Sequence, residues 1–244
     1  MLCDFAVVQN RGTLRSRTDV YIPHWPQPGL IPRDAARDVR VENMSFKGWL
    51  GNLHESFRTP EFEGKLRELG VRLVLSGKST SAVQWNDYSR DDLFLAARDL
   101  TEFDAKAKPA SKLVNAWNAG VPALLGPEPA FQELRRSEID YIEVIRPEDV
   151  IEAIRRLRDN PSLYRAMIAN GRERAEEFSK ERMIRMWVDA LSGPIAQAYE
   201  SWLERSQVRH FVDFALKIPR YRKAKATHLH HRDHGRRVLT GIIT

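Results

Sequence analysis

Apolar residues in positions 1–145 fall into short runs of strand length, separated by polar or charged stretches. Elsewhere they recur at helical spacing, as Phe62, Leu66 and Leu69 do, and again around residues 109–119. Buried strands that alternate with helices predict a parallel sheet with helices on both faces, an α/β Rossmann-like fold. Strands are expected at residues 5–8, 39–46, 71–75, 93–97, 121–125 and 141–145, and a strand or extended piece at 82–85.

After residue 145 the apolar pattern is purely helical. Helices are expected there over residues 147–158, from 160 to about 178, and from about 180 to 191. Before residue 145, a helix is expected over residues 61–69. Pro194 then opens a long amphipathic helix whose apolar positions include Tyr199, Trp202, Phe211 and Phe214. Little apolar content follows until Val238, so this tail is expected to be disordered.

These patterns divide the chain into four parts. Residues 1–34 combine a short strand with a proline-rich linker that contains Pro23, Pro26, Pro28 and Pro32. The α/β part is expected over residues 35–192, the long helix over 193–217 and the basic tail over 218–244.

Composition narrows the function classes. The single cysteine, Cys3, excludes an intramolecular disulfide, and no apolar run reaches the roughly 20 residues that span a bilayer, so a cytoplasmic protein is expected. Residues 217–244 hold eight basic residues and one acid, a net charge of +7, whereas the rest of the chain carries −1. The high charge therefore belongs to the tail and does not indicate a nucleic-acid-binding domain; the tail suits an anionic membrane surface or an acidic partner.

Residues 108–126 carry the strongest chemical signal. Lys108, Ser111, Lys112 and Asn115 cluster at the start of a predicted helix that Gly120 ends, and a helix N-terminus beside lysines favours an anion such as phosphate. The alternative is an ordinary strand–helix–strand unit with surface lysines and no ligand. Neither a P-loop, a nucleophile elbow nor a complete Gly-x-Gly-x-x-Gly motif occurs, which argues against an NTPase, an α/β-hydrolase and a dinucleotide oxidoreductase.

Further candidates follow predicted strands, where α/β sheets bind ligands. Asp87 and Tyr88 can contact a donor base or sugar, or form only a turn. Arg98 can bind a phosphate or pair with a neighbouring acid, and Glu128 can hold a sugar hydroxyl or serve as a solvated acid at a helix start. His24, in the linker, is a candidate general base or a structural histidine.

The chain resembles the C-terminal, nucleotide-sugar-binding half of GT-B-fold glycosyltransferases of the group 1/family 4 type. Four segments carry the resemblance: VENMSFKGWLGN (residues 41–52), KPASKLVNAWNAGVPALLG (108–126), the run from Asp140 to Asp149, and RRLRDNPSLYRAMIANGRERAEEFS (155–179). It implies that backbone amides at Gly48 and Gly51, with the helix start at Lys108 and Lys112, bind the donor diphosphate.

The resemblance implies transfer of a sugar from a nucleotide-diphosphate donor to an acceptor hydroxyl, such as that of a glycan, with no metal ion or cofactor required. Where many relatives carry two glutamates eight positions apart, this chain has Ala107 and Asn115. The N-terminal acceptor domain is largely missing, so we expect a fragment, a shortened protein or half of a two-chain enzyme, with residues 195–214 as a surface for the partner. The alternative is a non-catalytic binding or assembly subunit that retains the donor-domain fold.

Overall fold

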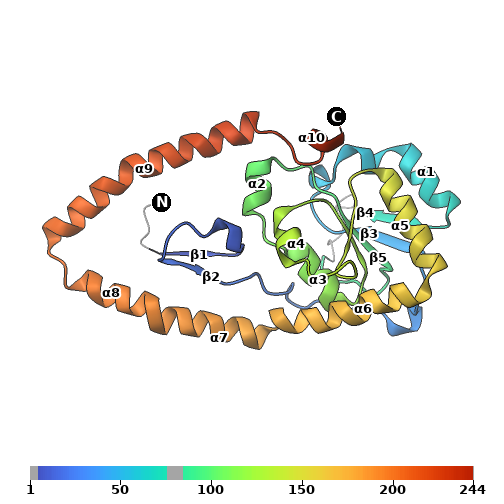
Figure 1. The fold of residues 1–244 in the computed structure, drawn as a ribbon, viewed down its shortest axis with the longest axis horizontal. Helices are drawn as coiled ribbons and strands as arrows, with labels where there is room; N and C mark the ends of the chain where they lie inside the picture. The colour runs from blue at the N-terminus through green and yellow to red at the C-terminus, as the bar shows by residue number, and fades with distance from the viewer. Residues whose placement is uncertain (1–4, 76–84, 244) are drawn as a thin grey trace.

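The computed structural model describes residues 5–75 and 85–243. Its main sheet has five parallel strands in the order β4-β3-β5-β6-β7 (Figure 1). The strands are β3 (Asn43–Phe46), β4 (Arg72–Leu75), β5 (Leu93–Ala96), β6 (Ala123–Leu125) and β7 (Ile142–Glu143). The predicted parallel sheet is confirmed, although residues 82–84 of the expected extended piece lie outside the described residues and Trp85 lies in a turn.

Helices cover both faces of this sheet, as the sequence predicted. Alternate residues of β5 point to opposite faces: Leu93 and Leu95 pack in one core, and Phe94 and Ala96 in the other. The first core includes residues of α1 (Pro60–Glu68) and α5 (Pro147–Asp159), and the second includes residues of α3 (Ser111–Ala119) and α4 (Pro129–Leu134). The long helix α6 (Pro161–Ala175) contributes residues to both cores.

Helix α3 is held in a defined position. It ends at Gly120, which has the left-handed φ of 67° that the sequence analysis expected there. Trp117 packs closely on Gly171 of α6, where an added Cβ would lie 3.0 Å from the indole ring. The same indole donates a hydrogen bond to the carbonyl of Asp140 (3.0 Å), so α3 is fixed both to α6 and to the loop before β7.

The N-terminal residues form a separate two-stranded parallel sheet of β1 (Ala6–Val8) and β2 (Asp19–Tyr21). Directly after β2, Ile22 is buried in a small core with Met183 and Ala190 of α7 (Lys180–Ala190). The following proline-rich segment contacts the main domain, where the N–H of Arg33 donates to the carbonyl of Ala119 (2.9 Å).

The C-terminal helices differ from the sequence prediction. The single helix expected over 193–217 is split into α8 (Ala196–Leu203) and α9 (Gln207–His234), and the tail expected to be disordered is helical through Pro219 to residue 234. Ser206 starts α9 by accepting a hydrogen bond from the N–H of Arg209 (3.3 Å). Low apolar content indicated that this segment buries little, but its lysines, arginines and alanines are good helix formers, so a helix forms on the surface.

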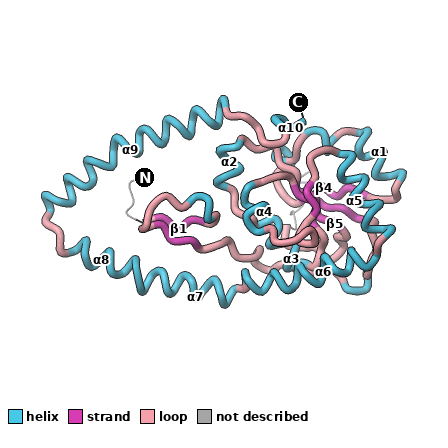
Figure 2. The backbone as a smooth tube through the Cα atoms, viewed as in Figure 1, coloured by secondary structure: helices cyan, strands magenta, loops and turns pink. Residues whose placement is uncertain are grey.

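The C-terminal arm, residues 180–243, leaves the domain through α7 and α8 and returns through α9 to α10 (Thr240–Ile243), with β1 and β2 between its limbs in the view of Figures 1 and 2. Its far end is docked on the main domain. Leu239 is fully buried in the first core, and the N–H of Val238 donates to the carbonyl of Leu100 (2.9 Å). In the described part of the chain, no helix is long and apolar enough to cross a bilayer.

Burial of Leu239 predicts that the C-terminal segment stabilises the α/β domain. Leu239→Ala removes a completely buried side chain, and we expect the free energy of unfolding to fall by about 3 kcal/mol in urea titrations. Ile242→Ala is the matched control because Ile242 is 46% exposed and its truncation leaves no comparable cavity. Equal stability of the Leu239→Ala variant and the unmodified chain would contradict docking of this segment.

Candidate functional site

The order of the strands locates the candidate site. Strand β3 pairs with β4 on one side and with β5 on the other, so the direction of chain progression reverses between β3 and β5. In open parallel sheets, ligands bind at such a reversal, outside the carboxyl ends of the strands. Lys47 and Gly48 follow β3 at this edge, Arg98 follows β5, and Glu128 follows β6.

Lys112 reaches this edge from the first turn of α3. Its ammonium group donates a hydrogen bond to the carbonyl of Lys47, and a Cβ added at Gly48 would lie 3.4 Å from its Nζ. The ring of Phe94 lies beneath it, with its centroid 5.9 Å from the Nζ. The structure therefore places the Lys112 amine against the glycine that follows β3. We call Lys47, Gly48, Arg98, Lys112 and Glu128 the switch-point cluster.

The N-cap residue of α3 is Ala110, whose side chain has no oxygen atom with which to cap the first turn. An uncapped first turn presents backbone N–H groups that a ligand can use. Ser111 is half-buried at this first turn. Lys108 is exposed three residues before the helix, and its carbonyl accepts a hydrogen bond from Asn10 Nδ2 (2.8 Å). Of the two predicted lysines, only Lys112 is directed at the glycine.

Arg98 pairs with Glu128 rather than with its sequence neighbours. The guanidinium Nε donates to Glu128 Oε1 (2.7 Å), the adjacent Nη2 pairs with Oε2, and both side chains are buried. Burial raises the pKa of Glu128, and the charges of Arg98, Lys112 and Lys108 act in the opposite direction. The predicted pairing of Arg98 with a neighbouring acid and the predicted solvated position of Glu128 are therefore wrong, because the two side chains form one buried ion pair beside Lys112. Ligand contacts of either side chain stay predictions.

A buried ion pair that the sequence analysis missed lies on the α3 side of β3. Lys47 Nζ lies 2.8 Å from Asp91 Oδ2, and the Ser45 hydroxyl donates to the same carboxylate oxygen (2.7 Å). Burial raises the pKa of Asp91, opposed chiefly by Lys47. The available signal was alternation: Ser45 of β3 and Lys47, directly after the strand, fall on the same face, where apolar residues would be expected.

Asp87, Tyr88 and Asn115 lie next to this ion pair. The Asp87 carbonyl accepts a hydrogen bond from Lys47 Nζ (2.6 Å), and the buried ring of Tyr88 lies 4.7 Å from that nitrogen. Burial raises the pKa of Tyr88, and Asn115 acts in the opposite direction. Asn115 also accepts a hydrogen bond from the N–H of Gln27 (2.9 Å), so it connects α3 to the linker.

His24 and Gly51 lie apart from the switch-point cluster in their described contacts. His24 contacts the carbonyl of Trp25 through Nδ1 (2.5 Å) and lines a groove of about 410 Å³ with Trp187 and Leu191. Gly51 is exposed, and a Cβ added there would lie 2.6 Å from the Trp49 ring. No described group of three or more His, Cys, Asp and Glu side chains is arranged to hold a metal ion.

Burial lowers the pKa of Lys112 to about 8, and the positive charges of Arg98 and Lys47 add to this effect, whereas Glu128 opposes it. An unfolded chain would hold this proton more tightly than the folded protein. Burying the ammonium group therefore lowers the free energy of unfolding by its full amount below pH 8. This loss of stability disappears as the pH rises toward the ordinary lysine pKa.

We therefore expect Lys112→Met to stabilise the protein at pH 7, by up to about 3 kcal/mol, and this gain to shrink between pH 8 and pH 10. Urea unfolding of the variant and the unmodified chain at pH 7 and at pH 10 measures the difference in the free energy of unfolding. Lys108→Met, which removes an exposed lysine near the same helix, should change the free energy of unfolding little at either pH. A Lys112→Met effect of the same size at both pH values would contradict the lowered pKa.

Solved structures share this fold. HepE of Anabaena, solved in complex with UDP, has a TM-score of 0.54 and 11% identity over 78% of this chain and 64% of its own. TarM has a TM-score of 0.52 and 9% identity over 75% of this chain and 42% of its own. Sucrose-phosphate synthase of Thermosynechococcus elongatus has a TM-score of 0.51 and 17% identity over 84% of this chain and 59% of its own. No family model and no curated protein matches the sequence.

This chain thus spans 42–64% of the length of these three proteins. At such low identities the likeness concerns the architecture: a parallel sheet flanked by helices, followed by further C-terminal helices. The resemblance to the C-terminal part of GT-B glycosyltransferases, inferred from four sequence segments, is confirmed at the level of the fold.

Proposed function

We propose that the switch-point cluster binds the diphosphate of a nucleotide-sugar donor and that the chain takes part in transfer of the sugar to an acceptor hydroxyl. The observation that carries this proposal is the Lys112 ammonium group, held against Gly48 at the carboxyl end of the sheet. The uncapped start of α3 adds backbone N–H groups and the positive end of the helix dipole.

The chemistry of sugar transfer suits such a cluster. The bond between the anomeric carbon and a diphosphate oxygen breaks, a bond to the acceptor oxygen forms, and the acceptor loses a proton to a base. Negative charge grows on the departing diphosphate, and fixed positive groups stabilise it without reorganising. Lys112 and the start of α3 would supply this charge, while the Arg98–Glu128 pair holds the neighbouring loops in place. His24 stays a prediction for the base.

The fold comparison supports a nucleoside diphosphate as the first probe, since the HepE structure contains UDP. We propose that the acceptor is held by a further domain or partner chain, in keeping with the partial length of this chain relative to its structural neighbours. Transfer from a nucleotide-sugar by the purified chain alone would exclude the alternative of a non-catalytic subunit.

Isothermal titration of the purified chain with UDP tests the site directly. We expect Lys112→Ala to weaken UDP binding by about tenfold to a hundredfold, because it removes a charge-assisted contact in a partly buried position. Lys180→Ala removes an exposed lysine at the start of α7 and is the matched control, with an expected affinity equal to that of the unmodified chain.

The pH dependence adds a second measurement. UDP affinity should fall as the pH rises through 8 and the Lys112 ammonium loses its proton, whereas a Lys112→Arg variant should keep its affinity because the guanidinium stays charged. Failure of UDP and its sugar derivatives to bind, or equal binding by the Lys112→Ala variant, would overturn the assignment of this site.

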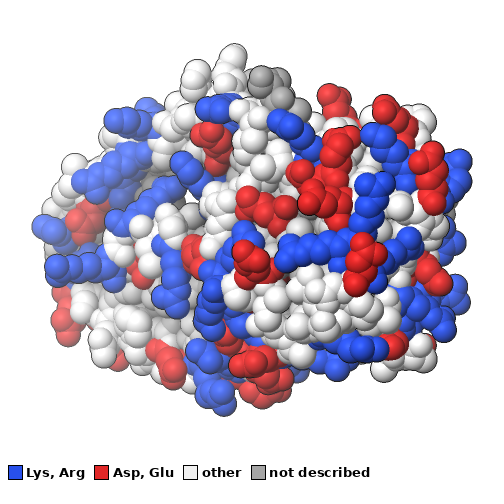
Figure 3. Space-filling model, turned by 45° about the vertical axis from the view of Figure 1, so that its right-hand side comes forward, with Lys and Arg blue, Asp and Glu red and all other residues white. Residues whose placement is uncertain are grey.

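We also propose an anionic lipid surface as the partner of α9. Val208, Phe211 and Phe214 on this helix are 73%, 72% and 51% exposed, and the basic residues Arg209, Lys217, Arg220, Arg222, Lys223 and Lys225 occupy the same helix. In Figure 3, Lys and Arg side chains predominate over acidic ones on the left-hand part of the surface, the side toward which the C-terminal arm extends in Figure 1. A helix with exposed apolar and basic residues favours the interface of an anionic bilayer.

Sedimentation with phosphatidylserine vesicles measures this contact. We expect binding that weakens with salt, and we expect Phe211→Glu to abolish it, because the substitution places a carboxylate in the apolar part of the contact. Vesicles of phosphatidylcholine alone are the control. Equal binding to the two kinds of vesicle, or none to either, would exclude an anionic surface as the partner.

A further inference from the structure

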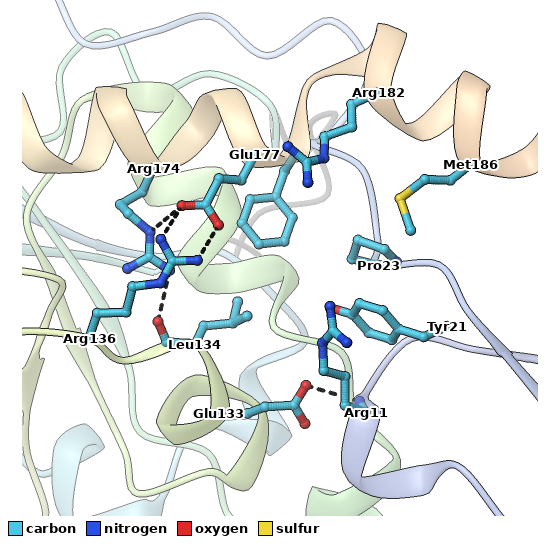
Figure 4. A pocket seen from close by; sticks show the side chains of 11 residues that line it. Arg11, Tyr21, Pro23, Glu133, Leu134, Arg136, Arg174, Glu177, Arg182 and Met186 are labelled. Carbon is cyan, nitrogen blue, oxygen red and sulfur yellow. Dashed lines mark hydrogen bonds and ion pairs between the residues drawn. The ribbon is translucent and has the colours of Figure 1, made fainter.

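A pocket lies against the C-terminal end of α4, the helix whose N-cap is Glu128 of the switch-point cluster (Figure 4). It measures about 160 Å³ and is enclosed by the β1–β2 unit, α4, the end of α6 and the start of α7. Its charged lining residues are Arg11, Arg136, Arg174, Arg182, Glu133 and Glu177. Four arginines and two glutamates give this lining a net charge of +2, and no residue of the switch-point cluster belongs to it.

The acidic side chains of the pocket already have partners. Arg136 donates to both oxygens of Glu177 (2.7 Å each), and Arg174 donates through Nε to one of them (2.9 Å). Arg174 is buried and also pairs with Asp140 (2.7 Å), so it forms a fixed floor. Both oxygens of Glu133 accept backbone N–H groups, from Arg11 and Gly12.

Two guanidinium groups remain available to a ligand. Figure 4 shows Arg182 of α7 and Arg11 of the β1–β2 unit extending into the space between these segments. Within the described parts of the chain, no carboxylate pairs with either guanidinium. The Arg11 guanidinium lies 4.4 Å from the centroid of the Tyr21 ring, and burial raises the pKa of the Tyr21 phenol.

We propose that this pocket binds the phosphate monoester group of a small soluble molecule between Arg11 and Arg182. Guanidinium groups bind phosphate oxygens through paired hydrogen bonds, and Arg11 and Arg182 bring two positive charges to a phosphate dianion. A space of 160 Å³ accommodates a phosphate and a few further heavy atoms. Such a ligand would connect the β1–β2 unit to α7.

Isothermal titration of the full chain with glycerol 3-phosphate and with inorganic phosphate tests the proposal. We expect Arg182→Gln and Arg11→Gln each to weaken binding by about tenfold. Arg185→Gln is the matched control, since Arg185 is an exposed arginine on the same helix that does not line the pocket. Arg182 is exposed as well, so its substitution should leave the melting temperature without ligand unchanged.

The comparison of the two probes distinguishes the sources of the phosphate group. Tighter binding of glycerol 3-phosphate supports an organic ester, whereas binding of inorganic phosphate alone overturns the ester and leaves a free-anion site. Absence of binding at millimolar concentrations, or equal weakening by Arg185→Gln, overturns the pocket.

Lys112→Ala should retain glycerol 3-phosphate binding, and loss of binding in that variant would place the ligand at the switch-point cluster instead. Failure of UDP to bind the chain leaves this proposal unaffected.

Discussion

The pairing of β3 with β5 is the constraint on which the switch-point cluster depends, because it brings Gly48 and Arg98 to one edge of the sheet. Asp92 fixes this pairing at the opposite ends of the two strands. Its fully buried carboxylate accepts hydrogen bonds from the N–H groups of Glu42 and Asn43 (2.9 and 3.0 Å) and pairs with Arg33 and Arg37. These contacts lower its pKa in spite of burial, so the anion is retained where an unpaired charge would be costly.

The carboxyl end of the sheet is organised differently from this amino end. At Asp92 each charge is matched. At the carboxyl end, Arg98 pairs with Glu128 and Lys47 with Asp91, and the half-buried Lys112 beside them adds a third cation to two carboxylates. Such an arrangement lowers stability unless an anion compensates for it, and excess buried charge of one sign is typical of binding sites. The difference between the two ends of one sheet therefore separates the contacts that hold the fold from those suited to a ligand.

Local pattern was enough to predict the five strands of the main sheet, the helices α1, α3, α5, α6 and α7, and the turn at Gly120, because each depends on residues close in sequence. It missed β2, α2 (Glu102–Ala107) and α4, which are short and carry little periodic signal. The pairs Arg98–Glu128 and Lys47–Asp91 join residues 30 and 44 positions apart, so only the register of the sheet determines them. Lys47 was identifiable in principle, since it interrupts the expected alternation on β3. The docking of Leu239 was not, because one leucine after a basic segment carries no signal of what it packs against.

The tail shows why composition alone misleads about structure. Residues 218–234 lack the apolar residues that a buried helix needs, yet they form a helix whose far end is held by Leu239 and by the bridge between Thr101 and Arg237. Near its other end, the arm is anchored by Ile22 against Met183 and Ala190. Because both anchors lie on or beside the α/β domain, helices with little burial of their own remain in place. The pocket lined by Arg11 and Arg182 adjoins the anchor that Ile22 forms with α7. A ligand bridging these two arginines would therefore act on the attachment of the arm rather than on the sheet.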